Sequence, residues 1–385
     1  MKHLGFLLHF YQPPWQSKEI LERILEECYY PLLDLIVRHE KACFTVNINY
    51  SLVELLKHCG HAKLLGLFAE AIRKEKMELT GSGAYHPILP LLDEHEIDRQ
   101  IRLNKEGLRK EGLEVGRGFF PPEMAFSPRI TTILKNHNYK WVISEDIPFC
   151  EKHGFAPFEF IPETDGLPVI LRSHLWSSSI AFKKIRGSIL EDINSKFGRW
   201  INGKDGYLVI GMDAETFGHH HKEYIGDLER FLDEIGNGGQ KKGLALEKIS
   251  EICDYFPKKP FEIPPGSWST SKEDMDNNIP FPLWNHPQNP VHRLLWQLTR
   301  MVLECRNHMS YEGRLALDKA LNSCQFWWAS SFHQDYDCAL QSLPLFWKAT
   351  LETKDSFLKG RVQRVIDLIS STTGCKIDLQ EIDLK

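Results

Sequence analysis

The chain has 385 residues, of which 42% are hydrophobic and 26% are charged, and its formal net charge is −5 at pH 7. This length predicts one large α/β domain with an appended unit, and the charge provides neither a basic face for nucleic acid nor a polybasic membrane anchor. No stretch approaches the roughly 20 apolar residues of a membrane-spanning helix.

The N-terminal run MKHLGFLLHFYQPP is apolar but reaches histidine and proline too soon for a secretion signal. It predicts a first strand at 4–10 instead. The nine cysteines are scattered and form no Cys-x-x-Cys pair, which favours reduced thiols over a disulfide framework or a zinc site. We therefore expect a cytoplasmic protein.

Strand-like and helix-like segments alternate along the chain to about residue 265, which predicts a parallel sheet that is closed into a barrel or doubly wound. Chemistry gathers at the carboxyl ends of the strands in such folds. The predicted strands are 4–10, 43–48, 77–82, 117–120, 141–144, 169–172, 208–212 and 261–263. The predicted helices between them are 19–37, 62–74, 95–111, 128–137, 179–196 and 222–235.

The pattern changes near residue 270, where four prolines between 280 and 290 interrupt a loop and helical periodicity follows. This periodicity predicts long helices at 291–306, 311–332, 335–352 and 357–370. We divide the chain into a catalytic domain at 1–268 and a C-terminal helical domain at 269–385.

Acidic residues follow two of the apolar strands. The run GFFPPEMAFS presents Glu123 after two prolines, which stiffen the backbone and fix where the carboxylate points. The run YLVIGMDAETFGHHH presents Asp213 and Glu215, and Gly218 allows a close turn past them. Two carboxyl groups at strand ends are typical of a glycosidase, with one as nucleophile or base and one as acid. A helix-capping role is the alternative for Glu123, and we favour an orienting role for Glu215.

Three adjacent histidines, His219 to His221, suggest a metal site at first sight. Adjacent side chains point in different directions, whereas the ligands of tetrahedral zinc must converge, so we expect no metal here and a substrate contact for one histidine. Other polar and aromatic groups near strand ends or in the helical region complete the predicted substrate contacts. The full set is His9, Gln12, Trp15, Ser82, Tyr85, His86, Glu215, Phe217, His220, Trp327 and Trp328.

Five segments occur in the order HFYQPP, GSGAYHPILP, PPEMAF, MDAETFGHH and SCQFWW. Together they resemble glycoside hydrolase family 57 over nearly the whole chain. Members of that family act mostly on α-glucans, as α-amylases, amylopullulanases and 4-α-glucanotransferases, with branching enzymes and an α-galactosidase among the remainder. The resemblance implies an α/β fold, a distorted (β/α)7 barrel followed by an α-helical bundle that completes the active-site cleft, and a retaining mechanism without a metal or other cofactor. It matches Glu123 to the nucleophile, Asp213 to the general acid/base, and His9 and Gln12 to substrate-site residues.

Four positions depart from the family pattern. Tyr11 stands where a second histidine is usual, Ala214 where tyrosine is common, and His219 where glutamate is common. Cys324 stands at about the position of an aspartate that often precedes the aromatic pair. These departures bear on substrate identity and leave both carboxylates in place. The chain is also short beside the branching enzymes of the family, which argues against branching.

We therefore predict a retaining hydrolase or transglycosidase of α-1,4-glucans, an α-amylase or a 4-α-glucanotransferase, with the two carboxyl groups about 5–5.5 Å apart. One alternative is a catalytically silent carbohydrate-binding homologue, which should lose Glu123 or Asp213, whereas this chain keeps both. The other is a metal-dependent polysaccharide deacetylase. Its candidate ligands His9, His86 and His220 lack the usual H-x-x-x-H spacing.

Overall fold

The computed structural model describes residues 1–182, 193–236, 243–353 and 355–379. Seven parallel strands close into a barrel in the order β1–β2–β3–β4–β5–β7–β8 and back to β1. A bridge between Gly81 and Phe119 joins β3 to β4, and β7 meets β8 at a single residue pair. The predicted distorted (β/α)7 barrel is thereby confirmed. Its strands are β1 (Lys2–Phe10), β2 (Phe44–Ile48), β3 (Met77–Leu79), β4 (Gly118–Phe119), β5 (Trp141–Glu145), β7 (Leu167–Arg172) and β8 (Gly206–Asp213).

The longer barrel strands are buried along nearly their whole length, because side chains fill the barrel on one face and helices cover the other. Strands of this kind have near-continuous apolar sequences, and for that reason the sequence predicted them well. The helices around the barrel are α1 (Lys18–Ile24), α2 (Tyr30–Arg38), α3 (Tyr50–His58), α4 (Lys63–Arg73), α5 (Glu94–Lys110), α6 (Thr131–Asn136), α7 (Asp146–His153), α8 (His174–Phe182), α10 (Gly198–Trp200), α11 (Tyr224–Glu234) and α12 (Ile249–Tyr255).

Some predicted elements differ from the structure. The strand predicted at 261–263 is wrong, since β10 occupies Lys258–Pro260 and pairs with β6 (Ile161–Thr164) outside the barrel. Both strands are short and contain proline, so they carry little periodicity. Strand β9 (Leu244–Glu247), which pairs with β1, and the helices α3, α7 and α12 were not predicted. Most of the predicted helix at 179–196 lies outside the described residues.

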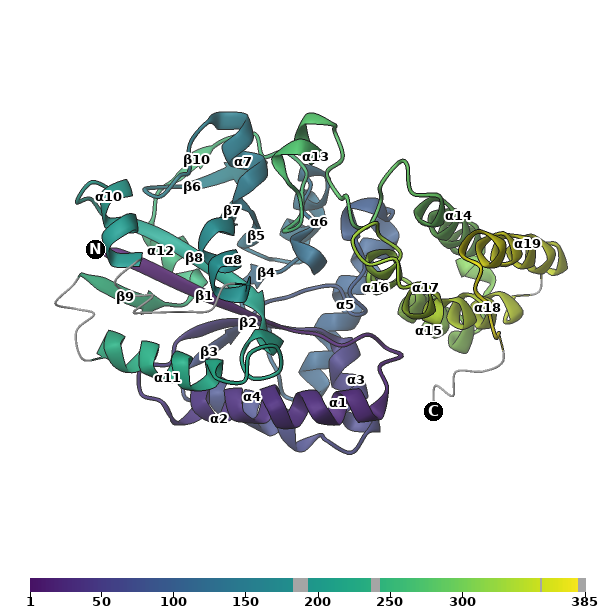
Figure 1. Cartoon of the computed structure of the whole chain (residues 1–385), viewed down its shortest axis with the longest axis horizontal. Helices are drawn as coiled ribbons and strands as arrows, with labels where there is room; N and C mark the ends of the chain where they lie inside the picture. Colours follow the sequence, from purple (N-terminus) through teal and green to yellow (C-terminus); the bar gives the residue numbers. More distant parts are fainter. Residues whose placement is uncertain (183–192, 237–242, 354, 380–385) are drawn as a thin grey trace.

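The C-terminal region is helical, as predicted, but its helices are shorter. A turn at Asn322 and Ser323 interrupts the predicted helix at 311–332, because the Asn322 amide donates to Lys319 O and Ser342 Oγ and thereby holds the turn. Figure 1 shows the helices from residue 290 onward on one side of the barrel. The elements are α13 (Lys272–Asp276), α14 (Pro290–Glu304), α15 (Tyr311–Ala320), α16 (Cys324–Trp328), α17 (Tyr336–Ala339), α18 (Leu343–Leu351) and α19 (Ser356–Thr373).

The helical region and the barrel share one apolar core. A single cluster of buried side chains runs from Ile97 and Ile101 of α5 to Leu295 and Leu298 of α14. The C-terminal helices therefore pack onto the barrel rather than forming a separate core. None of the helices in the described part of the chain has the length and apolarity to cross a bilayer.

Candidate active site

Glu123 follows β4 in a backbone conformation that is uncommon for its residue type. Its φ is 60° and that of Met124 is 48°, so two consecutive non-glycine residues are left-handed. The preceding prolines limit the approach of the chain, and Trp268 N donates to Glu123 O at 3.2 Å. Strained residues of this kind persist where the surrounding structure fixes them, and they cluster at functional sites.

The Glu123 carboxylate accepts one hydrogen bond on each oxygen. Trp268 Nε1 donates to Oε2 and Ser323 Oγ donates to Oε1, both at 2.9 Å. Burial raises the pKa of Glu123 to about 8, although the two donors favour the ionised form and lower it. The charge of Asp213 raises this pKa further, so the two carboxyl groups belong to one electrostatic site.

Asp213 is the last residue of β8 and lies opposite His9 of β1 in the parallel ladder. Its side chain is partly exposed at the carboxyl end of the strand. Burial raises the pKa of Asp213, and the nearby Arg172 guanidinium opposes that effect. Asp213 and Glu123 thus sit at the ends of two different barrel strands, as predicted, with interacting charges.

A stack of rings lines the same end of the barrel. The His9 ring stacks on those of Phe120, at 4.6 Å, and His86, at 4.9 Å, and the Tyr11 ring stacks on His86 at 4.0 Å and lies 6.0 Å from His9. His9 Nδ1 is hydrogen-bonded to Asn47 Oδ1 at 2.8 Å. Burial lowers the pKa of His9 to about 4 and lowers that of His86 as well, so both rings are neutral at pH 7.

The hydrogen bonds around Ser323 fix the tautomer of His86. When Glu123 is ionised, Ser323 donates its single hydroxyl proton to it, so Ser323 Oγ then accepts from His86 Nδ1, 2.8 Å away. Nε2 of the neutral ring then carries a lone pair. This atom is buried and has no partner among the described residues, so it can accept a hydrogen bond from a hydroxyl group of a ligand.

Glu215 lies behind the carboxyl pair in a buried polar cluster. Gln12 Nε2 donates to Glu215 Oε1 at 2.7 Å, and the Tyr29 hydroxyl donates to the same oxygen. Burial and the charge of Asp213 raise the pKa of Glu215. These contacts hold Glu215 in place, and its orienting role stays a prediction.

The other residues predicted to contact substrate differ in where their side chains lie. Ser82 is buried and accepts from Asn49 Nδ2 at 3.2 Å, whereas the Tyr85 hydroxyl turns to Glu54 at 2.8 Å. Phe217 packs in the core against Phe6. The structure does not bring Tyr85 or Phe217 to the carboxyl pair.

The predicted tryptophans belong to the edge of the second core cluster. Trp15, Trp327 and Trp328 are partly buried there. Trp327 and Trp328 meet edge to face at 4.6 Å, and His333 packs against both rings. They end α16, four and five residues after Ser323, the residue that reaches Glu123.

Sequence reasoning missed three residues of the site: Trp268, Ser323 and Arg172. Trp268 and Ser323 contact Glu123 across 145 and 200 residues of chain, and no local pattern marks such partners. The available signals were indirect. Trp268 ends the predicted catalytic domain, and Ser323 belongs to the SCQFWW segment.

Two of the four departures from the family pattern touch one another. Cys324 Sγ donates to the Tyr11 hydroxyl at 3.5 Å, beside the stacked His86 ring. Of the other two, Ala214 is buried, and His219 pairs with Glu27 at 2.5 Å. Tyr11 and Cys324 therefore form a single contact, and both interact with the charge of Glu123.

The histidine triplet does not converge. His219 pairs with Glu27, His221 Nε2 contacts Ala181 O at 2.9 Å, and His220 is exposed. Within the described ranges, one group of side chains has metal-ligating atoms close together, at the start of α5: Asp93, His95 and Glu96.

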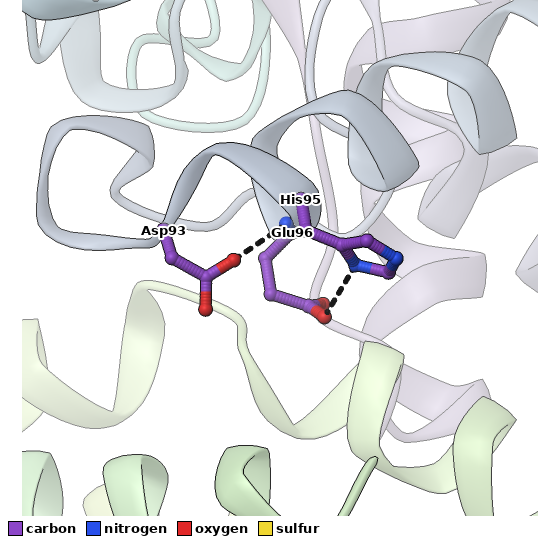
Figure 2. Close-up of side chains that lie close together, drawn as sticks. All are labelled: Asp93, His95 and Glu96. Atoms are coloured by element: carbon purple, nitrogen blue, oxygen red, sulfur yellow. Dashed lines mark hydrogen bonds and ion pairs between the residues drawn. The ribbon is translucent and has the colours of Figure 1, made fainter. Parts of the chain in front are cut away.

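That group is explained by other contacts. Asp93 Oδ1 caps α5 by accepting from Glu96 N, and His95 lies beside the Glu96 carboxylate (Figure 2). Arg306 pairs with both acids, and Arg314 pairs with Glu96. The acids are thus neutralised by arginines of the helical region and join that region to the barrel.

Over residues 8–264 the chain matches the sequence model of glycosyl hydrolase family 57. It is 31% identical over 151 residues to an alpha-amylase of Pyrococcus horikoshii, a match that covers 39% of this chain and 24% of that protein. The chain covers between 22% and 57% of the length of the first curated relatives that it matches.

Two solved structures share the fold. The 4-alpha-glucanotransferase from Thermococcus litoralis has a TM-score of 0.72 at 18% identity, with 92% of this chain and 59% of that chain covered. The GH57-type branching enzyme from Pyrococcus horikoshii has a TM-score of 0.66 at 17% identity, with 99% and 98% covered. At these identities the likeness establishes the fold.

Proposed function

The chain belongs to glycosyl hydrolase family 57, and from this premise we propose that it is a retaining hydrolase or transglycosidase of α-1,4-glucans. One observation carries the proposal above the others: the Glu123 carboxylate is fixed by two donors and interacts with the charge of Asp213. A held carboxylate facing a second carboxyl group is the arrangement that retaining glycoside transfer needs.

In the first step, Glu123 attacks the anomeric carbon while protonated Asp213 gives its proton to the departing glycosidic oxygen. The bond from the anomeric carbon to that oxygen breaks as the bond to Glu123 forms. Asp213 is then a carboxylate and removes a proton from water or from a sugar hydroxyl, which displaces Glu123. A separation of about 5–5.5 Å between the carboxyl groups is expected for this mechanism.

The environment of Glu123 suits a nucleophile. Ser323 and Trp268 occupy one lone pair on each oxygen and orient the group, while a second lone pair on each oxygen stays available. Burial raises the pKa of both groups, to about 6 for Asp213 and to about 8 for Glu123, so the unliganded pair holds its proton mainly on Glu123 between these values. The proposed roles require this proton to lie on Asp213 once substrate is bound. The two groups share protons, so one neutral acid and one carboxylate coexist over a range of pH.

We further propose that residues 269–385 act as a helical domain that completes the active site. Ser323 from this region donates to Glu123, and its backbone N donates to His86 O at 3.0 Å. Trp327 and Trp328, one turn further along α16, are candidates for stacking on sugar rings.

Hydrolysis, disproportionation and branching are three outcomes of the same first step. Chain length does not separate them, because the branching enzyme of Pyrococcus horikoshii is covered over 98% of its chain. We propose that the choice between water and a sugar acceptor depends on Tyr11 and Cys324, which contact one another, and on the aromatic side chains of α16. We favour α-1,4 hydrolysis or 4-α-transfer, in keeping with the named relatives.

Incubation of the full chain with maltoheptaose, followed by chromatography of the products, tests the proposal. Longer and shorter maltooligosaccharides together would indicate transfer, whereas steady release of glucose or maltose would indicate hydrolysis. Glu123→Gln serves as the inactive control. Absence of any product from maltooligosaccharides and from soluble starch would overturn the proposal and favour a silent carbohydrate-binding protein.

A further inference from the structure

Arg172, the last residue of β7, lies at the carboxyl end of the barrel. Its side chain is buried, and its guanidinium makes two directed contacts. Nη1 donates to Glu145 Oε2 of β5 at 2.6 Å, and Nε donates to Gly211 O of β8 at 2.7 Å. Gly211 precedes Asp213 by two residues, so this bond holds the segment that presents Asp213.

The same guanidinium also reaches the nucleophile side of the site. Its central carbon lies 5.9 Å from the centroid of the Trp268 ring, and Trp268 Nε1 donates to Glu123. A cation at this distance from an indole face is attracted to the ring. The Arg172 guanidinium therefore contacts both the strand segment that presents Asp213 and the indole ring that donates to Glu123.

Glu145 determines where this guanidinium lies. Its side chain is fully buried at the end of β5 and pairs with Arg172, while its second oxygen lies 3.2 Å from His174 Nδ1. A buried carboxylate needs such partners, since an unpaired charge in the interior is costly. The acidic end of the strand at 141–145, which the glycosidase mechanism does not use, is thereby explained.

We propose that Arg172, held by Glu145, is a positioning residue that sets Asp213 against Glu123 by fixing the end of β8 and the Trp268 ring. The inference rests on the proposed function for its rate consequences. Its structural content, that Arg172 and Glu145 act on Asp213, is measurable without turnover.

The charged groups around Arg172 and Asp213 determine in which direction each substitution should shift the pKa of Asp213. Arg172 is faced by Glu145 of β5, Asp146 of α7 and His174 of α8. Asp213 is faced by Arg172, by the carboxyl groups of Glu123 and Glu215, and by His9, which is neutral. Removing the cation should favour protonated Asp213, whereas removing the Glu145 charge should favour its ionised form.

The test compares Arg172→Gln with Glu145→Gln. For R172Q we expect kcat to fall about 10²-fold, because the carboxyl groups lose their alignment. We also expect the alkaline limb of kcat/KM to move up by about one pH unit. For E145Q we expect a smaller loss of kcat and a shift of that limb to lower pH, partly offset by weaker protonation of His174.

Arg172→Lys separates charge from geometry. A lysine ammonium keeps the positive charge but cannot reproduce the planar fork that joins Glu145 and Gly211 O. We expect R172K to keep the pH profile near that of the wild type while kcat stays lowered. Arg117→Gln, at an exposed arginine paired with Asp254, is the matched control and should change neither quantity.

Carboxyl ¹³C NMR of aspartate-labelled protein, with the Asp213 signal assigned from Asp213→Asn, measures the same effect without substrate. Opposite displacements of the Asp213 titration midpoint in R172Q and E145Q support the proposal. Equal midpoints in all variants, or displacements in the same direction, overturn it even where the wild type degrades glucan. Where the wild type is inactive, the proposed function fails, and the NMR titration still decides this inference. Thermal melting identifies a variant that does not fold. If R172Q does not fold, the Asp213 midpoints of E145Q and R172K decide. A lower midpoint in E145Q and a midpoint near that of the wild type in R172K support the proposal, and equal midpoints in both overturn it.

Discussion

Ser323 donates a hydrogen bond of 2.9 Å to Glu123, although 200 residues separate them in the chain. The hydroxyl comes from the N-terminus of α16 in the helical region, and the carboxylate comes from the end of a barrel strand. The same serine accepts from His86 Nδ1. The helical region therefore contributes directly to the environment of the proposed nucleophile, and its removal would leave Glu123 with one donor instead of two.

Replacement of either carboxyl group should abolish turnover without unfolding the chain. We expect Glu123→Gln and Asp213→Asn each to lower kcat by at least about 10³-fold, because each removes a group that takes part in bond making or proton transfer. Measurement of reducing-end release from maltoheptaose checks this. Glu54→Gln, a distant acid that accepts from Tyr85, is the control. A Glu123→Gln enzyme within tenfold of the wild type would refute the assignment.

Loss of a donor to Glu123 should move the pH dependence as well as the rate. The hydrogen bonds of Ser323 and Trp268 lower the pKa of Glu123, so Ser323→Ala and Trp268→Phe should raise it. We expect the pH–rate profile of both variants to shift to higher pH and kcat to fall about tenfold or more. Trp200→Phe, at an exposed tryptophan outside the site, should change neither. A lower kcat with an unchanged profile would show that these residues act through packing alone.

The raised pKa of Glu123 also predicts how stability changes with pH. The group has a pKa of about 8 in the folded chain against 4.5 ordinarily, so between these values the folded state holds a proton that the unfolded state has released. Unfolding free energy contributed by this group is therefore complete below pH 4.5 and is lost as the pH rises through 8. The difference in unfolding free energy between Glu123→Gln and the wild type should therefore change in favour of the variant by at least about 1 kcal/mol from pH 4 to pH 9.

Urea denaturation of the two proteins at both pH values measures this gain. Glu114→Gln, at an exposed acid, should show no such change. Equal differences between E123Q and wild type at pH 4 and pH 9 would mean that the Glu123 pKa is not raised by burial.

Much of the barrel could be predicted because its strands have a recognisable local sequence. Strands such as β1 and β8 are buried on both faces and have apolar sequences, and a carboxylate directly after such a strand lies at the barrel's reactive end. Asp213 was found in this way, and Glu123 from its position after the short β4. The five-segment resemblance supplied their roles.

The supporting residues could not be predicted in the same way. Trp268 and Ser323 are defined by contacts to one carboxylate across long stretches of chain, and Arg172 by contacts to two other strands. Tyr85 and Phe217 illustrate the opposite error. Both lie next to residues of the site in sequence, but their side chains leave the backbone in other directions and pack elsewhere.

The acid that joins the barrel to the helical region should matter for stability. Glu96 is fully buried and pairs with Arg306 and Arg314. Its replacement by alanine leaves Arg306 with Asp93 and Arg314 with Asp318 as their remaining acidic partners, so Glu96→Ala should lower the unfolding free energy by about 1–3 kcal/mol. Asp98→Ala, two residues along the same helix at a half-exposed acid that pairs with Arg102 and His137, should cost about 1 kcal/mol or less. Equal melting temperatures for the two variants would contradict a structural role for the buried pairs.

Gly218, five residues after Asp213, should be required because a side chain there would clash with a neighbouring backbone. Gly218 has a φ of 106°, and a Cβ at this position would lie 2.0 Å from Glu27 O. Gly218→Ala must therefore displace the backbone of the segment that carries Asp213 and Glu215. Gly60 also has a positive φ, 83°, but open space around the added atom.

The two glycine variants distinguish the cost of a positive φ from the cost of a steric clash. Gly60→Ala should cost about 1 kcal/mol through its φ alone, whereas Gly218→Ala should cost about 3 kcal/mol or more and lower kcat as well. Urea denaturation and maltoheptaose turnover of both variants check this. Similar losses in stability for the two glycines would mean that the loop yields without strain, and an unchanged kcat in Gly218→Ala would mean that its path does not position Asp213.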